Sequence, residues 1–136
     1  SQIHINNMEV NKLKEMYVKY NLTKADVYKH QHYIIITRSG IEKVMAVEQI
    51  DITYEVIKAE PNFAVMKATA KKGTKVIETF GSALKGAGFK DGSTNTWYVA
   101  EMAEKRALSR ATLKMANMYE LGFMGADESE DFKRKA

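Results

Sequence analysis

The sequence predicts an α+β domain in which a three-stranded antiparallel meander is covered by a long C-terminal helix and preceded by short helices. At Ile50 the spacing of apolar residues changes from a period near 3.6 to a period of 2, and three alternating segments follow with short turns between them. Further on, the stretch from Thr96 to about Leu121 holds neither glycine nor proline, which is typical of a long helix. A three-stranded sheet needs a cover on one face, and this helix supplies it.

The N-terminal third predicts short helices. Residues 1–8 show no period and are expected to form a loose arm. Helices are expected at Asn11–Tyr20 and at Arg38–Val47, with Thr37 as the N-cap of the second. Between them, Ile34–Ile36 is either a short buried strand or the beginning of a helix.

The meander is expected in the middle of the chain. The predicted strands are Ile50–Lys58, Phe63–Ala70 and Thr74–Phe80. Pro61 lies in the first turn, where its fixed backbone angle favours a chain reversal. The glycine-containing segment Gly81–Thr94 is then predicted to be a long flexible loop before the helix.

Length and composition indicate one globular domain over residues 1–125, followed by a charged tail at 126–136. No run of 18 apolar residues occurs, so no membrane span and no membrane partner are expected. The absence of cysteine excludes disulfides, thiolate nucleophiles and cysteine-bound metals. The net charge of +4 and the pI of about 9.2 are compatible with a polyanionic partner.

The sequence contains no recognisable catalytic motif, so no enzymatic activity, cofactor or metal is expected. The glycines of 81–90 do not fit the spacing of a phosphate-binding loop, and no hydrolase triad or zinc motif occurs. His30 and His32 would need further ligands to hold a metal. An enzyme would require both histidines and Glu104 to meet in one cleft.

The predicted long helix carries two different faces. Arg106, Arg110 and Lys114 lie in one row at positions i, i+4 and i+8, where they repel each other unless anions face them. Those anions are either acids of the sheet, such as Glu78 or Asp51, or phosphates of nucleic acid, unless the row is simply a solvated face. The other face is expected to pack on the sheet; it comprises Ala100, Glu104, Ala107, Ala111, Met115 and Met118.

Aromatic side chains lie at the beginning of this helix. Trp97 and Tyr98 stand near cations, which is the combination that a base-stacking site for single strands needs. An aromatic residue at a helix start is also commonly a core anchor, so both roles remain open.

The order of elements and the stretch Ala103-Glu104-Lys105-Arg106-Ala107-Leu108 resemble the Rad52 family of single-strand-annealing proteins and the related Erf-type phage recombination proteins. The resemblance covers about Tyr33 to Asp131. It implies a homo-oligomer, as a ring or an open helix, that carries single-stranded DNA in a basic groove during recombination or replication. It also implies a location in the cytoplasm of a bacterial or phage-infected cell.

The resemblance also implies which cations would contact the backbone. Lys105 and Arg106 match the family's basic helix, whereas Ser109 stands where the family has a further arginine, for which Arg110 is the substitute. Lys24 and Arg38 are candidates for an upstream cation of the family.

The function expected from the sequence is therefore binding of single-stranded DNA, with RNA as a further ligand, through electrostatic contacts and without catalysis. The alternative is an accessory domain that docks onto replication or recombination partners through the acidic tail Asp127–Phe132. The expected binding residues are Lys105, Arg106, Arg110, Lys114, Lys67, Lys71, Lys72, Lys75, Arg38, Trp97 and Tyr98.

Overall fold

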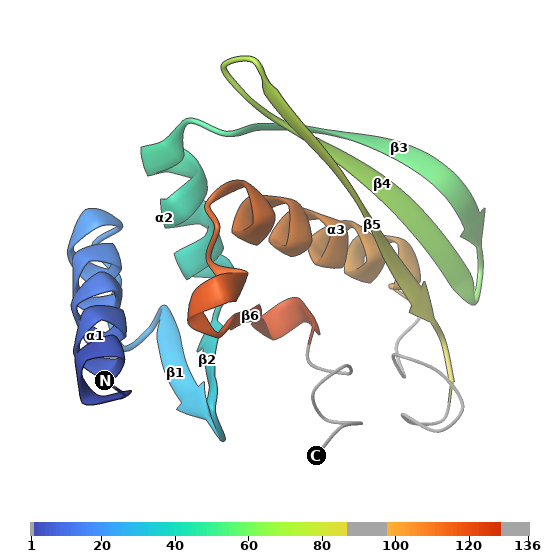
Figure 1. Cartoon of the computed structure of the whole chain (residues 1–136). Helices are drawn as coiled ribbons and strands as arrows, with labels where there is room; N and C mark the ends of the chain where they lie inside the picture. The colour runs from blue at the N-terminus through green and yellow to red at the C-terminus, as the bar shows by residue number, and fades with distance from the viewer. Residues whose placement is uncertain (1, 87–97, 129–136) are drawn as a thin grey trace.

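A computed structural model of the chain describes residues 2–86 and 98–128 (Figure 1). Within these ranges, no helix is long and apolar enough to cross a membrane. The elements in order are α1 (Gln2–Lys19), β1 (Val27–His30), β2 (Tyr33–Ile36), α2 (Arg38–Glu48), β3 (Asp51–Glu60), β4 (Phe63–Lys72), β5 (Lys75–Leu84), α3 (Val99–Met115), the 3-10 turn η1 (Tyr119–Leu121), β6 (Phe123–Gly125) and the 3-10 turn η2 (Ala126–Glu128).

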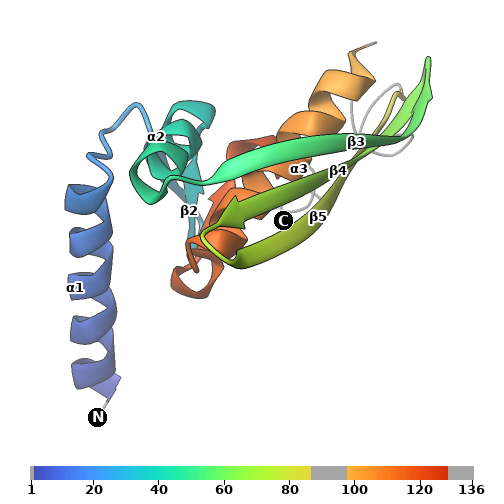
Figure 2. The ribbon, with the colours of Figure 1, turned by 90° about the horizontal axis from the view of Figure 1, so that it is seen from above.

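Helix α3 is the central layer of the fold. The antiparallel sheet β3-β4-β5 covers one side of it, and α2 with the small sheet β1-β2-β6 lies on the other side (Figures 1 and 2). The predicted α+β class and the meander packed on the C-terminal helix are confirmed. In Figure 2 the N-terminal part of α1 extends away from the other elements.

Small side chains bring α3 close to the large sheet. Ala103, Ala107 and Ala111 are fully buried against it. Ala107, Ala111 and Met115 of the predicted stripe pack here, whereas Ala103 was not predicted and Met118 packs in the core on the other side of α3. The Thr79 hydroxyl donates a hydrogen bond of 2.8 Å to the carbonyl oxygen of Ala107. A Cβ on Gly81 would collide with the backbone of α3, so this glycine sets the distance between helix and sheet.

The small sheet was not predicted. β1 and β2 form a hairpin whose turn contains Gln31 with φ of 55°, and β2 then pairs in parallel with β6 from the other end of the chain. The pairing of Ile34 with Phe123 closes this sheet. Ile34–Ile36 is thus a strand, which settles the alternative that the sequence left open.

Several predicted boundaries were wrong. The predicted loose arm at residues 1–8 is helical from Gln2, and β5 continues through Leu84 into the predicted loop. Residues 87–94 of that loop lie outside the described residues, as do residues 96–97 at the beginning of the predicted helix. The long helix ends at Met115 because Asn117 adopts a left-handed conformation with φ of 57°.

Thr37 occupies the predicted N-cap position of α2, but its side chain does not cap the helix. Its hydroxyl instead donates to the carbonyl oxygens of Ala25 and Asp26, both at 3.1 Å. The Asp26 carboxylate is buried and accepts hydrogen bonds of 2.6 Å from both Ser39 and Lys43. These contacts fasten α2 to the segment before β1.

Candidate nucleic-acid interface

The two arginines of the predicted basic row are engaged inside the domain. Arg106 is only 3% exposed and donates hydrogen bonds to the carbonyl oxygens of Ser82 at 2.9 Å and Asp127 at 3.0 Å. Arg110 donates to the carbonyl oxygen of Phe80 at 2.8 Å and to the buried carboxylate of Glu128 at 3.0 Å. The sequence predicts either acids of the sheet or phosphates as partners of this row. In the structure Glu128 and backbone carbonyls bind its two arginines, and Glu78 lies 3.7 Å from Lys67.

The spacing of these arginines matches that of the carbonyls they bind. Residues four apart on a helix rise by about 6 Å, and residues two apart on a strand by about 6.6 Å. Arg106 and Arg110 therefore reach Ser82 and Phe80 on β5, which is an edge strand of the large sheet. An unpaired strand edge needs such a cover, so both arginines have a structural role here.

The first residues of the predicted tail belong to this arrangement. The Glu128 carboxylate is 4% exposed and also accepts hydrogen bonds from the Tyr119 hydroxyl at 2.9 Å and the Gly125 amide at 3.0 Å. The Ser109 hydroxyl donates to the Asp127 carboxylate at 3.1 Å. The remainder of the acidic tail, at 129–136, lies outside the described residues.

Other predicted binding residues are scattered over the molecule. Lys67 lies on the outer face of the large sheet, with its ammonium 3.8 Å from Glu55 and 3.7 Å from Glu78. Arg38 pairs with Glu42 on α2 at 3.2 Å. Tyr98 is 69% exposed, and Trp97 lies outside the described residues.

Lys105 and Glu104 are neighbouring residues of α3. Lys105 is exposed, and Glu104 is half-buried near Tyr54, whose pKa is raised by burial and by the charge of Glu104. Within the part of the chain that the structure describes, no group of three or more acids or histidines could hold a metal ion.

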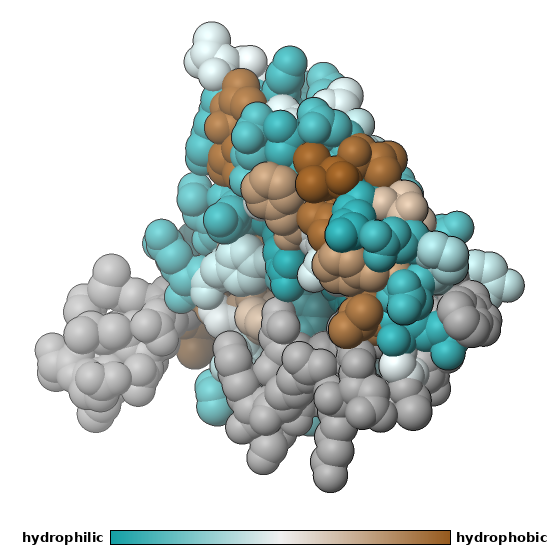
Figure 3. Space-filling view, turned by 90° about the vertical axis from the view of Figure 1, so that its right-hand side faces the viewer, coloured by the Kyte–Doolittle hydropathy of each residue, from teal (hydrophilic) through white to brown (hydrophobic). Residues whose placement is uncertain are grey.

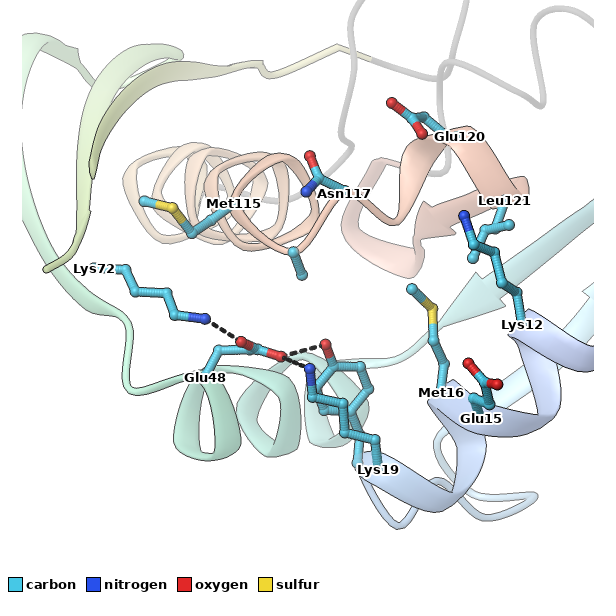
Figure 4. Close-up of a pocket in the computed structure, with 12 residues that line it drawn as sticks. Lys12, Glu15, Met16, Lys19, Glu48, Lys72, Met115, Asn117, Glu120 and Leu121 are labelled. Atoms are coloured by element: carbon cyan, nitrogen blue, oxygen red, sulfur yellow. Dashed lines mark hydrogen bonds and ion pairs between the residues drawn. The ribbon is translucent and has the colours of Figure 1, made fainter. Parts of the chain in front are cut away.

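An open cleft brings a different set of cations together. It has a volume of about 560 Å³ and lies between α1, the C-terminal ends of α2 and α3, and the end of β4 (Figure 4). Its lining combines cationic, acidic and apolar side chains. They are Lys12, Glu15, Met16, Lys19, Tyr20, Glu48, Lys72, Met115, Ala116, Asn117, Glu120 and Leu121.

Glu48 is the centre of this cleft. Its carboxylate is 9% exposed and accepts a 2.6 Å hydrogen bond from the Tyr20 hydroxyl, while the Lys19 ammonium lies 2.7 Å away. The Lys72 ammonium binds its other oxygen (Figure 4). Burial raises the pKa of Glu48, but the hydrogen bonds from Lys19, Lys72 and Tyr20 outweigh burial and bring the pKa down to about 2.

This depressed pKa predicts a loss of stability in acid. The pKa of Glu48 is lowered from its ordinary value of 4.5 to about 2 in the folded protein, so its contribution is present above pH 4.5 and is lost as the pH falls toward 2. Asp26, whose pKa is lowered mainly by Lys43 and then by Ser39, acts in the same direction. We expect Glu48 to contribute about 2 kcal/mol, after allowance for the solvent exposure of its lysines.

Urea unfolding at pH 7 and at pH 3 measures this contribution. The free energy of unfolding should fall less between the two pH values in Glu48→Gln than in the native chain. An equal acid loss in both proteins would mean that Glu48 is not held in its ionised form by these contacts.

Further predicted cations lie beside this cleft. Lys114 lines a neighbouring hollow that shares Asn117 and Glu120 with it. Lys75 is exposed on the β4–β5 hairpin and pairs with Lys72, so it shares the face of Lys72, whereas Lys71 alternates with Lys72 and lies on the outer face of the sheet with Lys67. We call the cleft with its rim the basic cleft; its cations are Lys12, Lys19, Lys72, Lys75 and Lys114.

Three of these five lysines were among the predicted binding residues, and Lys12 and Lys19 were not. The sequence feature that could have identified Lys12 and Lys19 is their spacing of seven residues, which places both on one face of a helix after two turns.

Comparison of the chain with protein-family models, with characterised proteins and with solved structures finds no match.

Proposed function

We propose that the protein binds single-stranded nucleic acid, in the first place DNA, through phosphate contacts in the basic cleft. The proposal rests on one observation: lysines from α1, the β4–β5 hairpin and the end of α3 lie around one open polar cleft. The lining itself holds equal numbers of lysines and glutamates, and Lys75 and Lys114 at the rim add the positive excess. This proposal moves the site from Arg106 and Arg110, in the middle of α3, to the C-terminal end of the helix.

The shape and chemistry of the cleft favour a backbone-led mode of binding. Lysines act as mobile point charges and contact phosphates without selecting a base. A volume of about 560 Å³ accommodates a ligand of nucleotide size. Met16, Met115 and Leu121 offer apolar wall for a sugar or a base. Binding of this kind leaves the remaining bases free for a second strand, as annealing requires.

The rim lysines provide the test. In Lys75→Gln with Lys114→Gln we expect affinity for an oligothymidylate to fall at low salt. We also expect the slope of log affinity against log salt to become less steep by about 1.4, because each single-strand phosphate contact contributes about 0.7. The matched control is Lys29→Gln with Lys58→Gln, which removes the same charge outside the cleft. Equal losses in both double variants would show only a general charge effect and contradict the assignment of the site.

Self-association is part of the proposal. Among the residues that the structure describes, β3 is an edge strand of ten residues that pairs only with β4, whereas the other edge, β5, is covered by Arg106 and Arg110. The outer face of the sheet leaves large apolar side chains exposed among polar ones (Figure 3); Val76 and Phe80 are 53% exposed and Leu84 is 40% exposed. Both features support contact with a second copy. A monomeric mass at every protein concentration would contradict this part.

A further inference from the structure

Glu48 forms ion pairs with two of the lysines that would contact phosphate in the proposed binding mode. Its carboxylate holds the ammonium groups of Lys19 and Lys72, which both line the basic cleft. A carboxylate and a phosphate bind the same donors, since both accept charge-assisted hydrogen bonds from ammonium and hydroxyl groups. Phosphate bound in the cleft must therefore share these donors with Glu48 or remove them from it.

We propose that Glu48 is a built-in competitor for phosphate, and that Lys72 is the side chain that exchanges between the two. This inference rests on the proposed function and concerns the regulation of the same site. In the free protein Lys72 neutralises Glu48; in the bound protein Lys72 turns to a phosphate of the strand.

The burial of the partners indicates why Lys72 exchanges. Glu48 is 9% exposed, so it needs donors at all times, whereas Lys72 is 44% exposed and can reach solvent without leaving its place in β4. When Lys72 departs, Glu48 retains Lys19 and the Tyr20 hydroxyl, both from the segment at the end of α1. The carboxylate thus stays paired, and α1 stays attached to α2.

The arrangement has a mechanical consequence as well. Glu48, at the end of α2, links α1 to the β4–β5 hairpin through Lys19 and Lys72 (Figure 4). Transfer of Lys72 to a phosphate breaks only the link to the hairpin. Ligand binding would therefore free the hairpin while the contact between α1 and α2 persists.

The deciding variant is Glu48→Gln, which keeps the size of the side chain and removes the charge. We expect it to bind an oligothymidylate about fivefold more tightly at low salt, because one partly exposed ion pair no longer competes. The salt slope should become steeper by about 0.7 as one further phosphate contact forms. The matched control is Glu120→Gln, which removes an acid of the same cleft that makes no ion pair with a described residue. A gain in Glu48→Gln no larger than in Glu120→Gln overturns the inference.

A double-mutant cycle identifies Lys72 as the exchanging group. Lys72→Gln should cost more affinity in the Glu48→Gln background than in the native chain, since Glu48 no longer occupies Lys72 there. Equal costs in the two backgrounds contradict the assignment to Lys72.

The outcomes separate the two proposals. If the native chain does not bind the oligonucleotide at low salt, the proposed function fails. If the native chain binds and the rim lysines matter, but Glu48→Gln is no tighter than Glu120→Gln, only the role of Glu48 fails. Should Glu48→Gln not fold, single variants in the native background decide: Lys72→Gln should then cost less affinity than Lys75→Gln, and an equal or greater cost overturns the inference.

Discussion

Replacement of Arg106 by alanine is expected to lower the free energy of unfolding by about 3 kcal/mol. The substitution removes the donor from the carbonyl oxygens of Ser82 and Asp127, whose hydrogen bonds are partly buried, and each such loss costs about 1–3 kcal/mol. It also removes the packing of a side chain that is 3% exposed. Urea unfolding monitored by circular dichroism measures the change.

Lys105 provides the matched comparison for Arg106. It is the next residue on the same helix, it carries the same charge, and it is exposed. Lys105→Ala should change the free energy of unfolding by no more than about 0.5 kcal/mol. If Arg106→Ala were as stable as Lys105→Ala and bound single-stranded DNA more weakly, Arg106 would belong to a binding surface rather than to the edge of β5.

Replacement of Gly81 by alanine is expected to destabilise the protein by about 3 kcal/mol, near the upper end of overpacking effects. The added Cβ would collide with the Ala103 carbonyl oxygen and the Ala107 amide nitrogen. These are backbone atoms of α3, so no side-chain rotation relieves the contact. The helix would have to move away from a sheet to which it is fitted by fully buried alanines.

Ser82→Ala is the control for Gly81→Ala, because Ser82 is the neighbouring residue of β5 and its side chain is exposed. It should stay within about 0.5 kcal/mol of the native chain. A thermal melt of Gly81→Ala that coincides with that of Ser82→Ala would show that α3 does not pack on the sheet as closely as described.

The large sheet could be predicted because its signals are local. Strict alternation identifies β3, and Pro61 and Gly73 mark the turns on either side of β4. The small sheet lacks such signals. Its hairpin turns at Gln31 without a glycine, and the partner of β2 lies some ninety residues away in β6, which no local pattern encodes.

In the candidate site, too, local features could be predicted from the sequence, whereas contacts between distant elements could not. The spacing of Arg106 and Arg110 establishes that they form a row, but phosphates and strand carbonyls suit that row equally well, and only the fold decides which of them faces it. Lys72 was predicted from its position in a hairpin turn. Its meeting with Lys19 and Glu48 depends on contacts between elements far apart in the sequence.

The most direct test of nucleic-acid binding is the affinity of the native chain for matched single- and double-stranded oligonucleotides across a salt series. We predict tighter binding of the single strand and a linear fall of log affinity with log salt, with a slope of about −0.7 for each phosphate contacted. No binding of the single strand at low salt, or an affinity that does not change with salt, would contradict the proposed function.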